Sequence, residues 1–161
     1  VGILMYLLNG VTGFSNNKSN PAPTVDGKQF KKICFAAVSE HSGVVLSFEE
    51  PKVATNFYKV TVKIFDSHVY ILLNSSYPFL AFASSVEYGS INFMDNHPLD
   101  RMFSTFYIVL SSLELNETLL VKKARGKVIL GIDNELSDAE IMELFYWKPS
   151  NIRDVVFNFW D

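Results

Sequence analysis

Polar and apolar residues alternate most regularly in the middle of the chain, from Tyr58 to Ile64. Val60, Val62 and Ile64 are apolar there, and charged or hydroxyl side chains separate them. A period of two predicts a strand with one buried and one solvated side, as in an antiparallel sheet. The nearly continuous apolar run VYILLN, residues 69–74, predicts a more central strand.

Further strands are expected on both sides of this pair. The runs FKKICFAAV (30–38) and GVVLSFEE (43–50) are β-rich and flank the polar turn SEHSG, which predicts a hairpin. TFYIVL (105–110) predicts another strand. The segment 118–132 predicts a second hairpin that turns at Ala124–Gly126, where glycine supplies the positive φ of a tight turn.

The period changes to that of a helix near the end of the chain. Ser137–Glu140, with the sequence SDAE, forms a capping box before apolar residues at helical spacing, and Pro149 ends that helix. Ser150 or Asn151 can cap a second helix. Its apolar stripe consists of Ile152, Val155, Val156 and Phe159.

These elements predict an α+β fold, in which two short C-terminal helices cover one side of a curved, mostly antiparallel sheet of about five to seven strands. Such a short helix is marginal alone, so we expect the aromatic tail to pack on the sheet. Residues 15–28 lack apolar periodicity. We therefore expect an apolar segment and linker over 1–29 and a single domain over 30–161.

Composition narrows the function classes. The apolar run from Ile3 to Leu8 is too short for a membrane span, and no Lys or Arg precedes Lys18, unlike a signal peptide. The single cysteine, Cys34, excludes an internal disulfide. The net charge of −3 provides no general attraction to nucleic acid or membranes. We expect a cytoplasmic protein that binds neither, with no metal or cofactor.

Two short motifs carry residue types used in catalysis. Asp66, Ser67 and His68 are the types of a hydrolase triad, but adjacent side chains diverge, so a hairpin turn is expected instead. Asp95 and His97 could share a metal or act as an acid/base pair; alternatively, Asp95 accepts backbone N–H bonds in a turn.

Charged residues gather in two places. Lys122, Lys123, Arg125 and Lys127 could hold phosphate, or they could be a solvated hairpin tip that prevents edge pairing. From Val128 to Trp147 there is no Lys or Arg. The acidic residues of that stretch are Asp133, Glu135, Asp138, Glu140 and Glu143. The helix dipole accounts for some of them, and the others predict an acidic face suited to a cationic partner.

The C-terminal residues 135–161, with YWKP followed by VFNFWD, resemble the ending of small bacterial proteins of the immunity-protein kind, which accompany toxins. The resemblance covers about a sixth of the chain. It implies a bacterial, non-enzymatic protein and supplies no catalytic residues.

Three functions remain as hypotheses. The first is a non-catalytic protein-binding module, of the immunity or antitoxin type, with a basic partner. Its expected contact residues are Asp138, Glu140, Glu143, Tyr146 and Trp147, although core packing explains the two aromatic residues equally well. The second is a small-ligand binder or enzyme, with Tyr88, Asp95 and His97 at a pocket on the concave side of the sheet. The third, nucleic-acid binding by the basic hairpin, is disfavoured by the net charge.

Overall fold

The alternating segment forms strand β2 (Phe57–Ile64), and the apolar run after it forms β3 (Ser67–Asn74). The structure is a computed structural model that describes residues 6–160. In β2, Val60 and Val62 are buried whereas Lys63 is exposed. β3 lies between β2 and β4, with apolar residues buried on both sides. Both strand predictions are confirmed.

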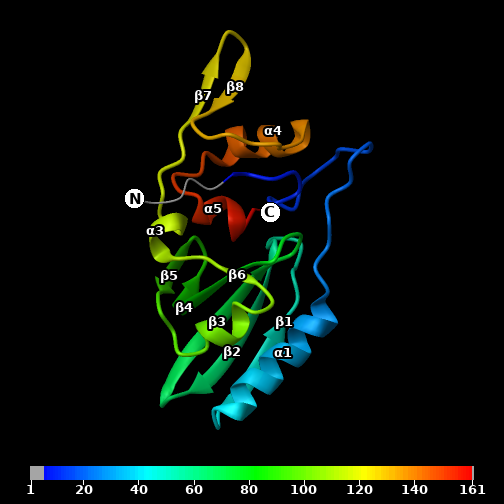
Figure 1. Cartoon of the computed structure of the whole chain (residues 1–161). Helices are drawn as coiled ribbons and strands as arrows, with labels where there is room; N and C mark the ends of the chain where they lie inside the picture. The colour runs from blue at the N-terminus through cyan, green and yellow to red at the C-terminus, as the bar shows by residue number, and fades with distance from the viewer. Residues whose placement is uncertain (1–5, 161) are drawn as a thin grey trace.

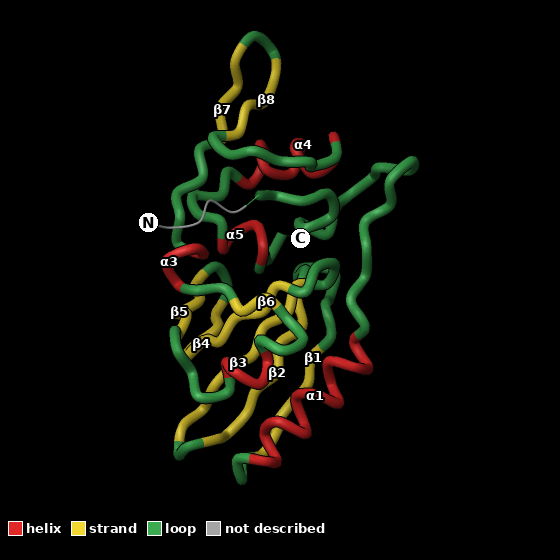
Figure 2. Tube along the Cα trace, viewed as in Figure 1, coloured by secondary structure: helices red, strands yellow, loops and turns green. Residues whose placement is uncertain are grey.

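The sheet has the order β1-β2-β3-β4-β5 (Figures 1 and 2). All of these neighbours are antiparallel. Short β6 pairs in parallel with the start of β4, and β7 and β8 form a separate hairpin at the predicted turn. The remaining strands are β1 (Val44–Glu49), β4 (Phe79–Glu87), β5 (Ser90–Met94), β6 (Ile108–Val109), β7 (Val121–Ala124) and β8 (Lys127–Leu130). The predicted α+β class is confirmed.

The segment predicted as the first strand is instead helix α1 (Gly27–Glu40), so the predicted hairpin over 30–50 is wrong. Its buried residues are Phe30, Cys34, Ala37 and Val38, a helical spacing. Asp26 caps it by accepting hydrogen bonds from the N–H groups of Lys28 and Gln29. β-Prone residues such as Ile33 and Phe35 suggested a strand, but the cap and the spacing determine the helix.

Four shorter helices follow. They are α2 (Asp100–Phe103), α3 (Ser112–Leu115), α4 (Asp138–Trp147) and α5 (Arg153–Val156). The capping box of Ser137 and Glu140 at α4 is confirmed, and Lys148 ends α4 in the left-handed conformation before Pro149. The predicted cap of α5 is wrong, because its N-cap is Ile152 and makes no side-chain bond. The Asn151 amide donates to the carbonyl of Asn116 at the end of α3 instead.

Each face of the sheet has its own apolar cluster. α1 and α2 pack on one face, around Phe30 and Phe103. On the other face, α5 packs with an N-terminal segment around Val11 and Phe157. α4 packs against the β7–β8 hairpin (Figure 1). The C-terminal tail is therefore part of the core, as predicted, and Trp160 is 6% exposed.

Three buried asparagines fasten both ends of the described chain to the sheet. Asn56 and Asn74, at the same end of β2 and β3, both donate to the carbonyl of Val11, at 2.8 and 3.0 Å. Each also donates to a carbonyl in α5. Asn158 donates to the carbonyl of Thr12 at 2.9 Å. The N-terminal segment around Val11 thus contributes to the same core as the C-terminal tail.

Among residues 6–160, no helix combines the length and the apolar character that a membrane crossing requires.

Candidate functional site

The position of α4 depends on the buried carboxylate of Glu140. Glu140 accepts hydrogen bonds from the N–H groups of Gly10 (2.9 Å), Thr12 (3.2 Å) and Ser137 (3.1 Å) and from the hydroxyls of Thr12 and Ser137. Its side chain is inaccessible to solvent. The structure therefore removes Glu140 from the predicted contact residues, because a partner could not reach it.

The opposite side of α4 faces solvent. Asp138, Met142 and Tyr146 follow one another at intervals of four residues, so they form one stripe along the helix. Met142 is 67% exposed and Tyr146 is 73% exposed. We call these three residues the α4 stripe. It contains two of the five predicted contact residues and adds Met142, which was not among them.

The two remaining predicted residues, Glu143 and Trp147, lie beside the α4 stripe and are both half-buried. The indole Nε1 of Trp147 donates to Glu143 Oε2 at 2.9 Å. The ring of Trp147 is parallel to that of Trp160, with centroids 6.3 Å apart, and meets Tyr146 edge-on at 5.2 Å. Trp147 therefore connects the exposed stripe to the buried tail.

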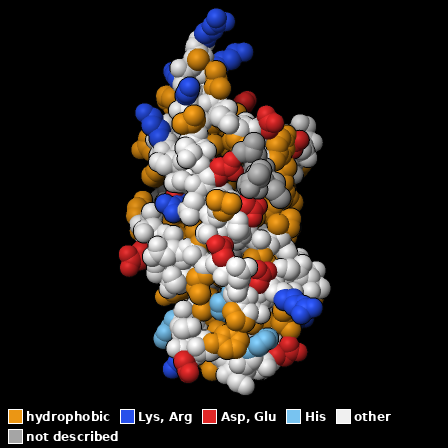
Figure 3. Space-filling model, turned by 60° about the vertical axis from the view of Figure 1, so that its left-hand side comes forward, with side chains coloured by type: hydrophobic (Ala, Val, Ile, Leu, Met, Phe, Trp, Pro, Cys, Tyr) orange, Lys and Arg blue, Asp and Glu red, His pale blue; other side chains and the backbone are white. Residues whose placement is uncertain are grey.

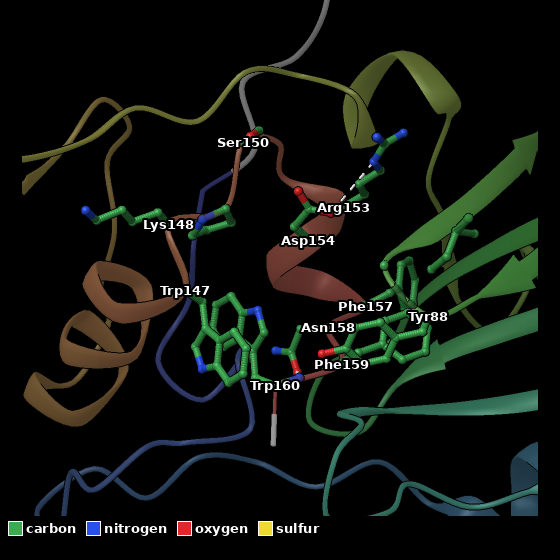
Figure 4. A pocket seen from close by; sticks show the side chains of 13 residues that line it. Tyr88, Trp147, Lys148, Ser150, Arg153, Asp154, Phe157, Asn158, Phe159 and Trp160 are labelled. Carbon is green, nitrogen blue, oxygen red and sulfur yellow. Dashed lines mark hydrogen bonds and ion pairs between the residues drawn. The ribbon is translucent and has the colours of Figure 1, made fainter.

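A groove of about 240 Å³ begins at Trp147 and runs between α5 and the β4–β5 turn (Figure 4). Trp147 and Trp160 form part of its wall, and Tyr88 and Phe159, with ring centroids 5.5 Å apart, form another part. The sequence indicated that the tail packs on a core. It did not indicate that the β4–β5 turn would bring Tyr88 to the tail.

The charged residues of the groove belong to its rim. Arg153 donates through Nη1 to the side chain of Asn116 at 2.8 Å, and its Nε lies 3.8 Å from Asp154 Oδ1. The Lys148 ammonium lies 5.6 Å from the ring centroid of Phe145. In Figure 4 the side chains of Lys148 and Arg153 point away from the two tryptophans. The groove is thus lined by aromatic side chains together with the polar residues Ser150, Asp154 and Asn158.

The residues of the alternative pocket, Tyr88, Asp95 and His97, do not meet. Tyr88 lies in the turn before β5, whereas Asp95 follows the other end of that strand. Asp95 accepts hydrogen bonds from the N–H (2.7 Å) and the hydroxyl of Ser112, and so holds the start of α3. Tyr88 lines the aromatic groove, and Asp95 lines a different hollow of about 280 Å³.

His97 is 7% exposed and belongs to the packing of the sheet. Its ring stacks on Phe82, with centroids 4.9 Å apart, and its Nδ1 accepts the N–H of Leu99 at 3.1 Å. Burial lowers the pKa of His97; nearby Asp100 opposes this shift and His41 adds to it. The ring is therefore held within the packing of the sheet by this stacking and hydrogen bond.

The other side chains with reactive groups also belong to the core or to turns of the fold. Cys34 is buried in α1, and burial raises the pKa of its thiol far above the usual value. Phe65 and Asp66 have positive φ in the turn between β2 and β3. The predicted hairpin turn is therefore confirmed, but only Asp66 lies in it, because Ser67 and His68 already belong to β3. Within residues 6–160, no three His, Cys, Asp or Glu side chains are grouped so that they could hold a metal ion.

Comparisons of the chain with protein-family models, with curated proteins and with solved structures gave no match.

Proposed function

We propose that this protein is a non-catalytic protein-binding module that contacts its partner with the α4 stripe and the adjoining Trp147. The observation that carries this proposal is the exposure of Met142 and Tyr146, two large side chains on one side of a well-anchored helix. Methionine and aromatic residues are enriched in protein interfaces, and tyrosine and tryptophan often supply most of the binding energy.

Acidic residues at the start of α4 and in the loop before it favour a cationic partner, whereas the ammonium groups of Lys123 and Lys148 lie near Phe145, toward the other end of the helix. Asp133, Glu135 and Asp138 are exposed, and Glu143 is half-buried. The ion pairs among the described residues involve Glu49 and Asp154 and none of these four acids. Their charge is thus available to steer a basic surface and to select against acidic ones. A bacterial inhibitor of the immunity or antitoxin type, as the C-terminal resemblance implies, fits this surface.

The test is co-purification from the native host with tagged wild-type protein and with the double variant Asp138→Lys/Tyr146→Ala. Both residues are exposed, so the variant should fold normally. We expect a basic protein to bind the wild type and to bind the variant at least tenfold more weakly, with an affinity that decreases as salt increases.

The matched control is Glu40→Lys, which reverses an exposed charge at the end of α1, far from α4 (Figure 1). It should retain the partner. The proposal would be contradicted if both variants lost the partner equally or if the double variant retained it. It would also be contradicted if no partner bound the wild type.

A further inference from the structure

The hairpin of β7 and β8, residues 121–130, extends away from the rest of the molecule beyond α4 and carries a cluster of cations (Figures 1 and 3). We call these residues the basic finger. Its cations, all exposed, are Lys122, Lys123, Arg125 and Lys127. It contains no acidic residue. The rest of the chain therefore has ten Lys and Arg residues against all seventeen Asp and Glu residues. The net charge of −3 therefore conceals a strongly uneven distribution.

The finger is held at its base and free at its tip. Val121 and Leu130 pack at the edge of the core, and the Lys123 ammonium lies 5.5 Å from the ring centroid of Phe145 in α4. At the tip, Arg125 and Gly126 have φ values of 52° and 79°, as in a tight two-residue turn. A Cβ placed on Gly126 would meet no atom within 4 Å. The tip is thus open to a ligand.

Arg125 is an unusual residue for this turn. Glycine, asparagine and aspartate are the residues that adopt positive φ readily, and an arginine is strained there. Its side chain is exposed and forms no hydrogen bond or ion pair with a described residue. The contacts within the fold therefore give no reason for a guanidinium at the tip, which points to a role in binding.

We propose that the basic finger binds double-stranded DNA by entering the major groove. A two-stranded ribbon is one of the two elements that fit this groove. With four residues in each strand, the finger is roughly 13 Å long. This length exceeds the depth of the major groove, which is about 8.5 Å, and the groove is about 12 Å wide. Arg125 at the tip can donate two hydrogen bonds to guanine, and Lys122 and Lys127 can contact phosphates.

Duplex DNA suits the finger better than an acidic protein does. Protein interfaces are depleted of lysine and enriched in aromatic residues, whereas three of the four cations here are lysines and residues 121–130 contain no aromatic residue. The negative charge of the remaining chain should limit contact to the finger. The finger packs against α4 but includes none of the three residues of the α4 stripe, so the proposal does not depend on the function proposed above.

The test measures binding of a fluorescent 20-base-pair duplex to the full chain by anisotropy, between 25 and 200 mM salt. We expect micromolar affinity at low salt and a slope of log K against log salt of about −3, for phosphate contacts by the three lysines of the finger. Lys122→Ala/Lys127→Ala should reduce the slope by about 2, whereas Lys28→Ala/Lys32→Ala, on the exposed side of α1, should leave it unchanged.

Arg125→Asn separates binding from folding. Asparagine adopts positive φ more readily than arginine, so the thermal midpoint should stay the same or rise while DNA affinity falls at least tenfold. The proposal is overturned if the duplex does not bind at 25 mM salt or if Arg125→Asn binds it as the wild type does. It is also overturned if the α1 control reduces the salt slope as much as Lys122→Ala/Lys127→Ala does. Binding of a labelled polyglutamate peptide as tightly as the duplex would also overturn it, in favour of an acidic protein partner.

Discussion

At the scale of single residues, the carboxylate of Glu140 joins the N-terminal segment to the start of α4. Its five hydrogen bonds reach Gly10 and Thr12 in the N-terminal segment and Ser137 at the start of α4. A buried carboxylate is stable only when its oxygens are so fully bonded. Local sequence shows only the bond to Ser137, because the capping box is a local motif. The partners from the N-terminal segment are more than 120 residues away.

We predict that Glu140→Ala decreases the free energy of unfolding by at least about 3 kcal/mol, because each buried donor left without an acceptor costs roughly 1–3 kcal/mol. Urea unfolding followed by fluorescence measures this change. Asp138→Ala, which removes an exposed acid from the same helical turn, should change stability by less than about 1 kcal/mol. Similar effects of the two substitutions would show that Glu140 does not anchor α4.

At the scale of elements, local signals identify most of the chain. The alternation in β2, the glycine turn of the finger and the capping box of α4 each specify an element without distant contacts. α1 has a local signal as well, in Asp26 and the spacing of its buried residues. That signal competes with a β-prone composition, and such propensities are weak compared with tertiary packing.

We predict that Asp26→Ala decreases stability by about 1 kcal/mol, because the N–H groups of Lys28 and Gln29 lose their acceptor. Asp26→Asn retains an acceptor oxygen and should stay close to the wild type. Thermal unfolding followed by circular dichroism distinguishes the two variants. If Asp26→Asn is as destabilised as Asp26→Ala, the side-chain cap is not what stabilises the start of α1.

At the scale of the whole molecule, the two ends of the described chain meet on one face of the sheet. The asparagines before β2 and at the end of β3 donate to Val11 and to α5 together. Because the same side chains hold both segments, the segments should loosen together. This arrangement also explains why the aromatic side chains of Phe157 and Trp160 are buried.

We predict that Asn74→Ala decreases stability by roughly 2–3 kcal/mol, because it removes the donor to the carbonyls of Val11 and Val156. Hydrogen exchange should then become faster in residues 7–12 and 155–160 at once. Asn92→Ala, at an exposed asparagine of β5, is the control and should leave both segments protected. Faster exchange in one segment alone would show that Asn74 does not hold the two segments together.

The candidate site was predictable only in part, because it too depends on contacts between distant segments of the chain. Tyr146 and Trp147 stand out as aromatic residues at the end of a capped helix, but the sequence alone leaves their exposure undecided. Packing places Tyr146 at 73% exposure and sets Trp147 beside Trp160. Tyr88 comes from a turn almost sixty residues earlier in the chain, so no local pattern could assign it to this groove.

The sequence by itself determined the α+β class, the central strands, the second hairpin and the capped helix α4, because alternation, capping and turn residues act between near neighbours in the chain. Only the tertiary structure decided that both faces of the sheet are covered, that Glu140 is internal, that the α4 stripe is exposed and that the basic finger stands apart from an acidic body. Those features depend on burial and on hydrogen bonds between distant segments, and these interactions arise only when the whole chain packs.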